Sequence, residues 1–453
     1  MRPRRRPFKT AFVATVTVLA LLCALFAVLG YVQGPKLASA QIDSAQAVVR
    51  AGEQLRLFAN QPLAAVDEGD VTITPAVDFS VSVSGAIIAV QFAAPLHYDA
   101  DYEVTVSGVT SRYNDQGATL SYSFTTGSSP LYYLDRGDET DEIVRTTVSS
   151  ADRDVVYAAP GIQGFAILAG AVVVSTDQPD GTSALGLVSL DDGGVEPLAL
   201  PGAGTVDQLH ASDSASTIGF AFTSAPGSAD GFDDTLMTLD LDQGRDVLPV
   251  SGLDGAPLQV SAWGFVPGGA TLAAYARDSS VVLVDPAAGV VTPLGSFTKF
   301  DSISTDGTRL AVGNAFGPVV LSMADLSDTE FAPSPIGDVV PYPGRFQSMR
   351  GSELVQQVVL VNYADSTFAS ILVVDDGDTS RLLFRTVDDG GSIGDFSVSP
   401  NDQLVAVEIV PDVSTTVSDG RAVDPQSTDV TTVFVDIASG SIVKSVAGFA
   451  VQW

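Results

Sequence analysis

The sequence predicts an all-β protein whose larger part is a seven-bladed β-propeller closed by its C-terminal strand. Short strand-like runs recur in groups of four across residues 129–453, separated by Gly-, Asp- and Asn-rich turns. The final run, 446–453, repeats at 448–451 the Gly-Phe-Ala-apolar phrase of 164–167, which opens a unit, and the sequence stops there. A ring of four-stranded units that pairs its two ends keeps its sheet edges short and protected, which is the propeller architecture.

The repeats can be placed one after another along the chain. Their spacing is close to the roughly 40 to 50 residues expected of a propeller blade. The first unit takes the C-terminal run as its first strand and 130–158 as its other three. The remaining predicted units are 163–200, 208–250, 260–294, 300–332, 346–387 and 396–446.

Two turns between the first and second strands share a phrase. Residues 304–311 read Ser-Thr-Asp-Gly-Thr-Arg-Leu-Ala, and residues 399–406 read Ser-Pro-Asn-Asp-Gln-Leu-Val-Ala. Pro and Asp or Asn followed by Gly favour a tight reversal, and the apolar residues that follow fill the core between sheets. This phrase resembles the Ser-Pro-Asp-Gly turn of TolB-like and WD40-like propellers, although no Trp-Asp dipeptide occurs.

A second β unit is predicted over residues 44–127. About seven short alternating strands in a segment of this length are typical of a β-sandwich. Three of its phrases, at 58–63, 95–106 and 122–126, resemble the bacterial Ig-like domains of surface-layer proteins. That resemblance implies spacing and display at a cell surface, and it transfers no catalytic residue.

The N-terminal segment predicts export. Residues 1–9 are basic and are expected in the cytoplasm, and the uncharged segment 10–33 is long enough to span a membrane as a helix. Ala38-Ser39-Ala40 has the small-x-small pattern of a signal-peptide cleavage site. Either a single-pass membrane anchor or a cleaved signal is compatible with these features. In both cases the two β domains lie outside the cytoplasm.

Composition restricts the partners. With 54 acidic against 22 basic residues, the net charge is −32, so nucleic acid and anionic membrane surfaces would be repelled. The single cysteine, Cys23, lies in the apolar segment, so no disulfide is expected within the exported part. The membrane is therefore expected as a partner only through the N-terminal segment. No cofactor is expected, although calcium is possible.

The sequence predicts no catalytic site. Only two histidines occur, His97 in the sandwich and His210 on an inner strand, so neither a His-rich metal cage nor a nucleophile with its base is expected. No catalytic or cofactor-binding residue is therefore expected, and the sequence does not identify metal ligands. The tripeptide Arg136-Gly137-Asp138 matches an adhesion motif but is expected to be an ordinary turn.

Two functional classes follow from this sequence. The first is a membrane-anchored, non-enzymatic binding or scaffold protein at the cell surface, whose propeller face recognises a protein or a cell-envelope glycan. The alternative is a propeller enzyme that acts on glycans through paired carboxylates. The sequence favours the first class because no catalytic motif is expected, and it does not show which acidic residues converge.

Overall fold

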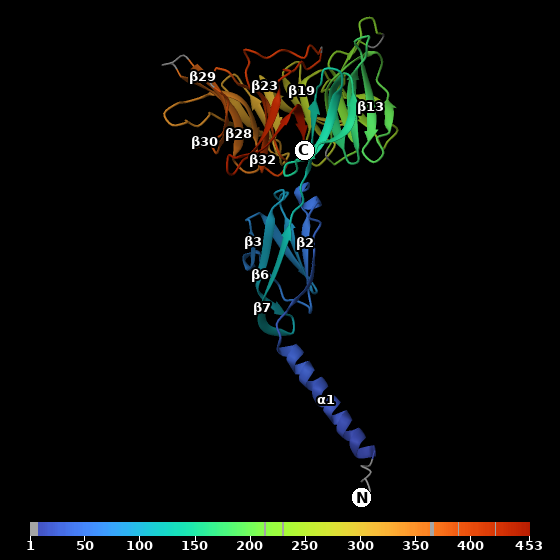
Figure 1. Ribbon diagram of the computed structural model, residues 1–453, viewed down its shortest axis with the longest axis vertical. Helices are drawn as coiled ribbons and strands as arrows, with labels where there is room; N and C mark the ends of the chain where they lie inside the picture. Colours follow the sequence, from blue (N-terminus) through green and yellow to red (C-terminus); the bar gives the residue numbers. More distant parts are fainter. Residues whose placement is uncertain (1–7, 213, 229–230, 363–366, 388, 422) are drawn as a thin grey trace. The chain divides into compact units, whose positions relative to one another are not determined.

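The computed structural model describes residues 8–212, 214–228, 231–362, 367–387, 389–421 and 423–453 (Figure 1). The chain divides into two compact units, Met1–Ser129 and Pro130–Trp453. Residues 1–7 of the predicted basic segment 1–9 lie outside the described residues. Both units are built almost entirely from antiparallel strands.

The first unit begins with one helix, α1 (Phe8–Val32), at the position predicted for the N-terminal apolar helix. Among the described residues, no helix has both the length and the apolar character needed to cross a membrane.

Two sheets follow the helix in the first unit. One has the order β1-β2-β5-β4 and the other the order β3-β6-β7. Their strands are β1 (Leu37–Gln41), β2 (Gln54–Ala59), β3 (Val71–Thr74), β4 (Phe79–Ser84), β5 (Ile87–Phe92), β6 (Asp101–Ser111) and β7 (Asn114–Thr125). Short 3-10 helices, η1 (Gln46–Val48) and η2 (Glu68–Asp70), lie in the connections.

The burial pattern explains why these segments form strands. Leu55 and Leu57 of β2 are fully buried, whereas Arg56 between them is exposed, as expected for a strand with one face on a core. Two boundaries differ from the sequence prediction. Strand β1 precedes residue 44 and pairs with β2, and β7 begins eight positions before residue 122. Both segments are rich in small or polar residues, so the alternation of apolar and polar residues that indicates a strand is weak in them.

The second unit is a β-propeller. Its described residues form seven successive four-stranded sheets, which follow one another in sequence order (Figure 1). Blade one has the order β10-β9-β8-β35, and each other blade uses four consecutive strands, from β11–β14 to β31–β34.

The strand bounds agree closely with the predicted repeats. Blades one to three contain β8 (Pro130–Asp135), β9 (Asp141–Thr147), β10 (Asp154–Ala159), β11 (Ile162–Leu168), β12 (Ala171–Asp177), β13 (Ser183–Ser189), β14 (Val195–Leu198), β15 (Gly204–Ala211), β16 (Thr217–Ser224), β17 (Thr235–Asp240) and β18 (Val247–Pro249). Blades four and five contain β19 (Val260–Phe265), β20 (Leu272–Ala276), β21 (Ser280–Asp285), β22 (Val290–Ser296), β23 (Lys299–Ile303), β24 (Arg309–Gly313), β25 (Pro318–Ser322) and β26 (Asp328–Glu330). Blades six and seven contain β27 (Tyr342–Ser348), β28 (Leu354–Asn362), β29 (Thr367–Asp375), β30 (Ser380–Arg385), β31 (Ser392–Val398), β32 (Leu404–Val410), β33 (Thr431–Asp436) and β34 (Ile442–Ala447).

The last strand, β35 (Phe449–Gln452), closes the ring as predicted. It pairs antiparallel with β8, with Phe449 opposite Leu134 and Gln452 opposite Tyr132. Phe449 is 2% exposed, and the Trp453 ring packs edge-on against Phe434 of blade seven. The C-terminal strand therefore ties the first and last blades together.

The cores of the propeller lie between neighbouring blades. One cluster joins blades two and three through Phe220, Phe222 and Met237, and another joins blades six and seven through Leu372, Phe396 and Val407. First strands of adjacent blades, such as β11 and β15, also contact each other. These first strands are therefore the inner strands of the ring.

Candidate functional site

The inner strands carry a cavity of about 640 Å³, which we call the inner cavity. Its walls come from β11, β15, β31 and β35 and from the segment that connects β32 with β33. Three carboxylates face this one cavity, which the sequence did not predict. The lining residues are Gln163, Gly164, Phe165, Ser175, Val206, Asp207, Gln208, Leu209, His210, Ala211, Asp395, Val423, Asp424, Ala450, Val451 and Gln452.

A recurring backbone irregularity shapes the inner strands. All seven first strands have a register shift against their neighbour, for example between Asp207 and His210 in β15 and between Ile393 and Asp395 in β31. Gln208 has a φ of 50°, within the left-handed region that non-glycine residues rarely adopt. A β-bulge bends a strand and re-aims its side chains. The bulge in β15 therefore determines how Asp207 and His210 meet the cavity.

Asp207 is the most perturbed carboxyl of the cavity. Its side chain is open to the cavity, but the surrounding wall removes part of its hydration, and this desolvation raises its pKa. The negative charges of Asp424 and Asp234 raise the pKa further. Only its own neighbouring backbone lowers it, through the hydrogen bond that the Gln208 amide donates at 2.7 Å. Asp207 therefore retains its proton to a higher pH than an ordinary aspartate does.

Asp424 supplies the second carboxyl. It lies in the β32–β33 connection with a φ of 45°, and its Oδ1 accepts a hydrogen bond of 2.9 Å from the side-chain amide Nε2 of Gln426. Its charge also raises the pKa of Glu408, for which burial is the larger cause. The charge of Asp424 therefore acts on two other acids, Asp207 and Glu408.

Arg345 places a positive charge beside one acidic residue of the inner cavity, Asp395. Arg345 contacts the Asp395 carboxylate, and its guanidinium lies 5.2 Å from the centre of the Phe396 ring. Burial lowers the pKa of Arg345, whereas the charges of Asp301 and Glu408 raise it. Glu408 in turn accepts a hydrogen bond of 2.6 Å from the Ala450 amide of β35. Asp395 and Glu408 are therefore engaged with protein groups, whereas no ion pair in the described part of the chain involves Asp207 or Asp424.

His210 lies on an inner strand, as predicted. Its ring packs edge-on against Trp263, with 4.9 Å between the ring centres. The ring remains accessible from the cavity, but the protein packed around it lowers its pKa to about 4. The imidazole is therefore neutral at pH 7 and can donate one hydrogen bond and accept another.

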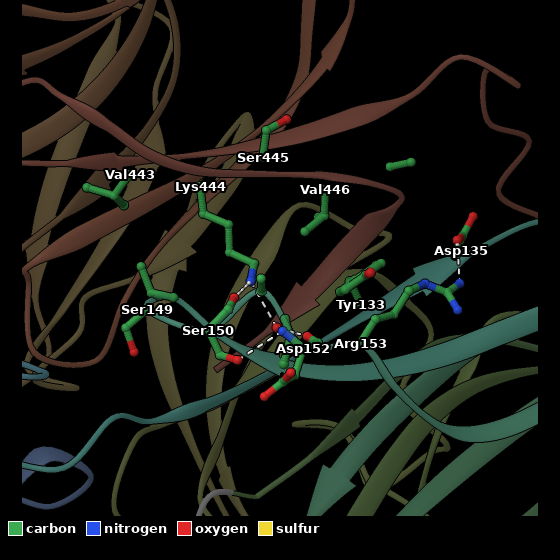
Figure 2. Close-up of a pocket in the computed structure, with 14 residues that line it drawn as sticks. Tyr133, Asp135, Ser149, Ser150, Asp152, Arg153, Val443, Lys444, Ser445 and Val446 are labelled. Atoms are coloured by element: carbon green, nitrogen blue, oxygen red, sulfur yellow. Dashed lines mark hydrogen bonds and ion pairs between the residues drawn. The ribbon is translucent and has the colours of Figure 1, made fainter.

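A second cavity, of about 610 Å³, lies between blades one and seven (Figure 2). Lys444 points into the segment 146–150, where its ammonium donates to Thr146 Oγ1, Thr147 O and Ser150 O at 2.9, 2.8 and 2.6 Å. Because an ammonium has three protons, all of its donors are used within the protein. Arg153 is likewise paired, with Asp135 and Glu142. Lys444 therefore links blade seven with blade one, whereas the Arg153 pairs lie within blade one.

The remaining sequence candidates carry no chemistry. Within the described residues, no group of three or more His, Cys, Asp or Glu side chains could hold a metal ion. The side chain of Arg136 is only 6% exposed and pairs with Asp419, so the Arg136-Gly137-Asp138 tripeptide is not displayed as an adhesion motif. His97 lies in the first unit and is not among the residues that line the inner cavity.

A phrase at the start of β31 matches a hydrolase motif in its spacing. Residues 390–394 do have the Gly-x-Ser-x-Gly spacing of a nucleophile motif. Ser392, however, is the first residue of β31, and the strand-to-helix turn that exposes such a serine is missing there. The phrase therefore provides no nucleophile.

The carboxylates of the inner cavity were missed for a physical reason. Asp207 immediately precedes the position at which the sequence places the first strand of blade three, and Asp424 lies in a connection without a repeat pattern. Their convergence depends on ring closure, which brings positions more than 200 residues apart to one cavity. An Asp on the first run of a blade is the signal that could have found Asp207.

Comparison with known proteins agrees with the fold and identifies no family. No family model matches the chain, and no curated protein matches it. Similar solved structures include dihydro-heme d1 dehydrogenase NirN, at 14% identity over 71% of this chain and 74% of that chain, with a TM-score of 0.42. Oligogalacturonate lyase in complex with manganese matches at 11% identity over 85% and 98%, with a TM-score of 0.44. The β-propeller domain of the Trilobed protease from Pyrococcus furiosus matches at 9% identity over 73% and 93%, with a TM-score of 0.42.

These structures correct one functional prediction. The sequence analysis concluded that the chain is not an enzyme, because it expected no catalytic motif. Two of the similar structures are a dehydrogenase and a lyase, which contradicts that conclusion. Their activities are their own, and at these identities they say nothing about a reaction of this chain. The arrangement of residues in the inner cavity has to carry any functional assignment.

Proposed function

We propose that the propeller is an enzyme that hydrolyses a glycan at the inner cavity, with Asp207 and Asp424 as its paired carboxylates. The supporting observation is that these two acids share one cavity and that the charge of Asp424 helps to raise the pKa of Asp207. Two acids whose environments separate their protonation states are the usual basis for assigning acid and base roles. Glycoside hydrolysis needs such a pair on either side of the bond that breaks.

The roles follow from the raised pKa of Asp207 and from the side-chain contact of Asp424. Asp207, which retains its proton longer, donates it to the glycosidic oxygen as the bond to the sugar carbon breaks. Asp424 takes a proton from the water whose oxygen forms the new bond to that carbon. One water is consumed, and a proton returned from Asp424 to solvent balances the one that Asp207 takes up. The Gln426 amide holds the Asp424 carboxylate through its 2.9 Å hydrogen bond.

The cavity favours an uncharged substrate. Its acidic groups, Asp207, Asp395 and Asp424, and the net charge of −32 would repel a polyanionic sugar chain. The neutral imidazole of His210 can donate to or accept from a sugar hydroxyl. We therefore propose a neutral cell-envelope glycan as the substrate class and no nucleic acid partner.

Purified protein incubated with a panel of neutral and acidic glycans, with and without calcium, tests this proposal. We expect release of reducing ends from a neutral glycan, lowered by at least about 100-fold in Asp207→Asn and in Asp424→Asn. Asp191→Asn is the matched control, because Asp191 lies in an exposed turn of blade two. Binding without turnover across the panel would contradict the proposal and leave recognition as the role of the cavity.

We further propose that the chain is held at the outer face of a cell membrane. The described side chains of α1 from Phe12 to Cys23 are exposed and almost all apolar, which supports burial of this helix in lipid. The basic residues before it support a cytoplasmic N-terminus. The two-sheet first unit then serves as an Ig-like spacer between the membrane and the propeller.

The position of the cleavage signal supports an anchor over a cleaved signal. Ala38, Ser39 and Ala40 lie in β1, which pairs with β2, and cleavage after Ala40 would remove almost the whole strand. Protease added to intact cells should remove both β units and leave a membrane fragment of a few kilodaltons. A mature protein in the medium that begins at Gln41 would contradict the anchor.

A further inference from the structure

The connection between β32 and β33 is the longest irregular segment that reaches the inner cavity. We call its described residues, 411–421 and 423–430, the strap. The strap folds back on itself: the Asp419 amide donates to Gln426 O and the Thr428 amide donates to Val417 O, both at 2.9 Å. Ser418 and Ser427 form an isolated bridge between the two arms. The strap is therefore a hairpin-like arm of blade seven.

Two reciprocal ion pairs fasten this arm to blade one. Arg136 Nη1 lies 2.5 Å from Asp419 Oδ2, and Arg421 Nη2 of the strap lies 2.7 Å from Asp141 Oδ2. The first pair is nearly inaccessible, with side chains 6% and 11% exposed, and Asp141 is fully buried. The other Arg136 nitrogen, Nη2, donates to Gln163 O of blade two at 3.0 Å.

Apolar packing of the strap against blade one comes from Val430, which is half-buried against the core cluster that contains Leu134 and Phe449. None of the described strap residues is buried, and Val413 and Val417 are 45% and 64% exposed. Segments with few buried apolar contacts belong to the least stable parts of a protein and open locally. The ion pairs therefore hold the strap against blade one together with Val430, and loss of one ionic partner leaves the other charge buried without compensation.

The strap also carries Asp424. Arg136 Nη1 donates to the Asp424 carbonyl oxygen at 3.2 Å, so one guanidinium contacts both the Asp419 carboxylate and the backbone of Asp424. Arg136 itself does not line the inner cavity, whereas Asp424 and Val423 do. A displacement of the strap would remove the Asp424 carboxyl from the cavity that Asp207 faces.

We propose that Arg136 is a positioning residue, which latches the strap onto blade one and thereby holds Asp424 in the inner cavity. This inference rests on the proposed function in one respect only, because it makes Asp424 part of a catalytic pair. The latched position of the strap itself requires no catalytic activity. When the contacts of Arg136 with Asp419 and Asp424 are lost, the strap moves away from blade one. Asp207 then remains in the inner cavity, and Asp424 does not.

The position of the strap can be measured without a substrate. Because Cys23 is the only cysteine, a Cys23→Ser background allows two spin labels on new cysteines, at exposed Ser418 of the strap and at exposed Asp191 of blade two. Pulsed electron resonance on the full chain should give one narrow distance distribution. In Arg136→Gln the distribution should broaden and move to longer distances.

Two further variants keep the test decisive. Arg153→Gln is the matched control, because Arg153 is also an arginine of blade one, and both of its carboxylate partners, Asp135 and Glu142, belong to blade one and not to the strap; its distribution should not change. Arg421→Gln removes a more exposed latch residue and serves if Arg136→Gln does not fold. A narrow, unshifted distribution in folded Arg136→Gln or Arg421→Gln would overturn the latch.

Turnover separates this inference from the proposed function. On a glycan that the wild type hydrolyses, Arg136→Gln should lower kcat by about 100-fold, the scale of a displaced catalytic group, and should change KM by no more than about twofold. Arg136→Lys should recover part of the rate. An unchanged kcat in a variant whose strap has opened would overturn the positioning role. Absence of turnover in the wild type would instead overturn the proposed function, while the label distances still decide the latch.

Discussion

At the scale of single residues, the inner cavity is defined by how its walls change protonation. Burial and the charges of Asp424 and Asp234 act in the same direction on Asp207, whereas burial alone lowers the pKa of His210 to about 4. The same cavity thus raises the pKa of an acid and lowers the pKa of an imidazole. A protonated carboxyl and a neutral imidazole both donate hydrogen bonds, which suits recognition of hydroxyl-rich molecules.

Removing a remote charge should move the pH dependence of turnover. Asp234 raises the pKa of Asp207 but is not among the residues that line the inner cavity. Because the general acid must be protonated, kcat/KM falls as pH rises through the pKa of Asp207. In Asp234→Asn this alkaline limb should move to lower pH at nearly full activity. A pH–rate profile measures the limb, and an unchanged limb would argue against Asp207 as the acid.

His210 should make the fold sensitive to mild acid. Its folded pKa of about 4 is below the unfolded value of 6.5, so below pH 6.5 the unfolded state binds a proton that the folded state does not. The free energy of unfolding therefore falls as pH drops from about 6.5 towards 4. In His210→Gln the part of this decrease in the free energy of unfolding that comes from His210 should disappear. Urea unfolding at several pH values measures it, and parallel curves for the two proteins would refute the effect.

At the scale of elements, the repeat pattern predicted most strands and missed what shapes the site. The seven groups of four runs, and the return of the C-terminal run to blade one, were predictable because alternation and turn residues are local signals. The bulges of the inner strands were not, because a register shift depends on both paired strands. The strap was not predicted either, since its contacts with Arg136 and Asp141 join positions about 280 residues apart.

Ring closure by β35 should contribute strongly to stability. Deleting 448–453 removes the buried Phe449 and the Trp453 contact with Phe434, and it exposes the edge of β8. We expect the free energy of unfolding to fall by more than the roughly 3 to 5 kcal/mol typical of truncating one buried aromatic. Denaturant unfolding measures the loss, with deletion of Trp453 alone as a milder comparison. A shortened protein as stable as the parent would show that the pairing is dispensable.

At the scale of the whole molecule, each function depends on a different unit. The acidic cavity and its latch belong to the propeller, whereas the apolar helix and the two-sheet unit contain no part of the inner cavity. This division agrees with the sequence pattern, in which the basic and apolar N-terminus is separate from the acidic repeats. Export and the exclusion of nucleic acid stay predictions from composition, whereas the shared cavity of the two carboxylates could not be predicted, because they meet only in the closed ring.

Incorporation of oxygen from solvent tests glycan hydrolysis most directly. A neutral glycan would be incubated with the protein in water enriched in oxygen-18, and the products analysed by mass spectrometry. We predict one heavy oxygen at each new reducing end with the wild type and with Asp191→Asn, and almost none with Asp207→Asn. Products without the heavy isotope, or equal labelling by Asp207→Asn, would contradict hydrolysis by the paired carboxylates of the inner cavity.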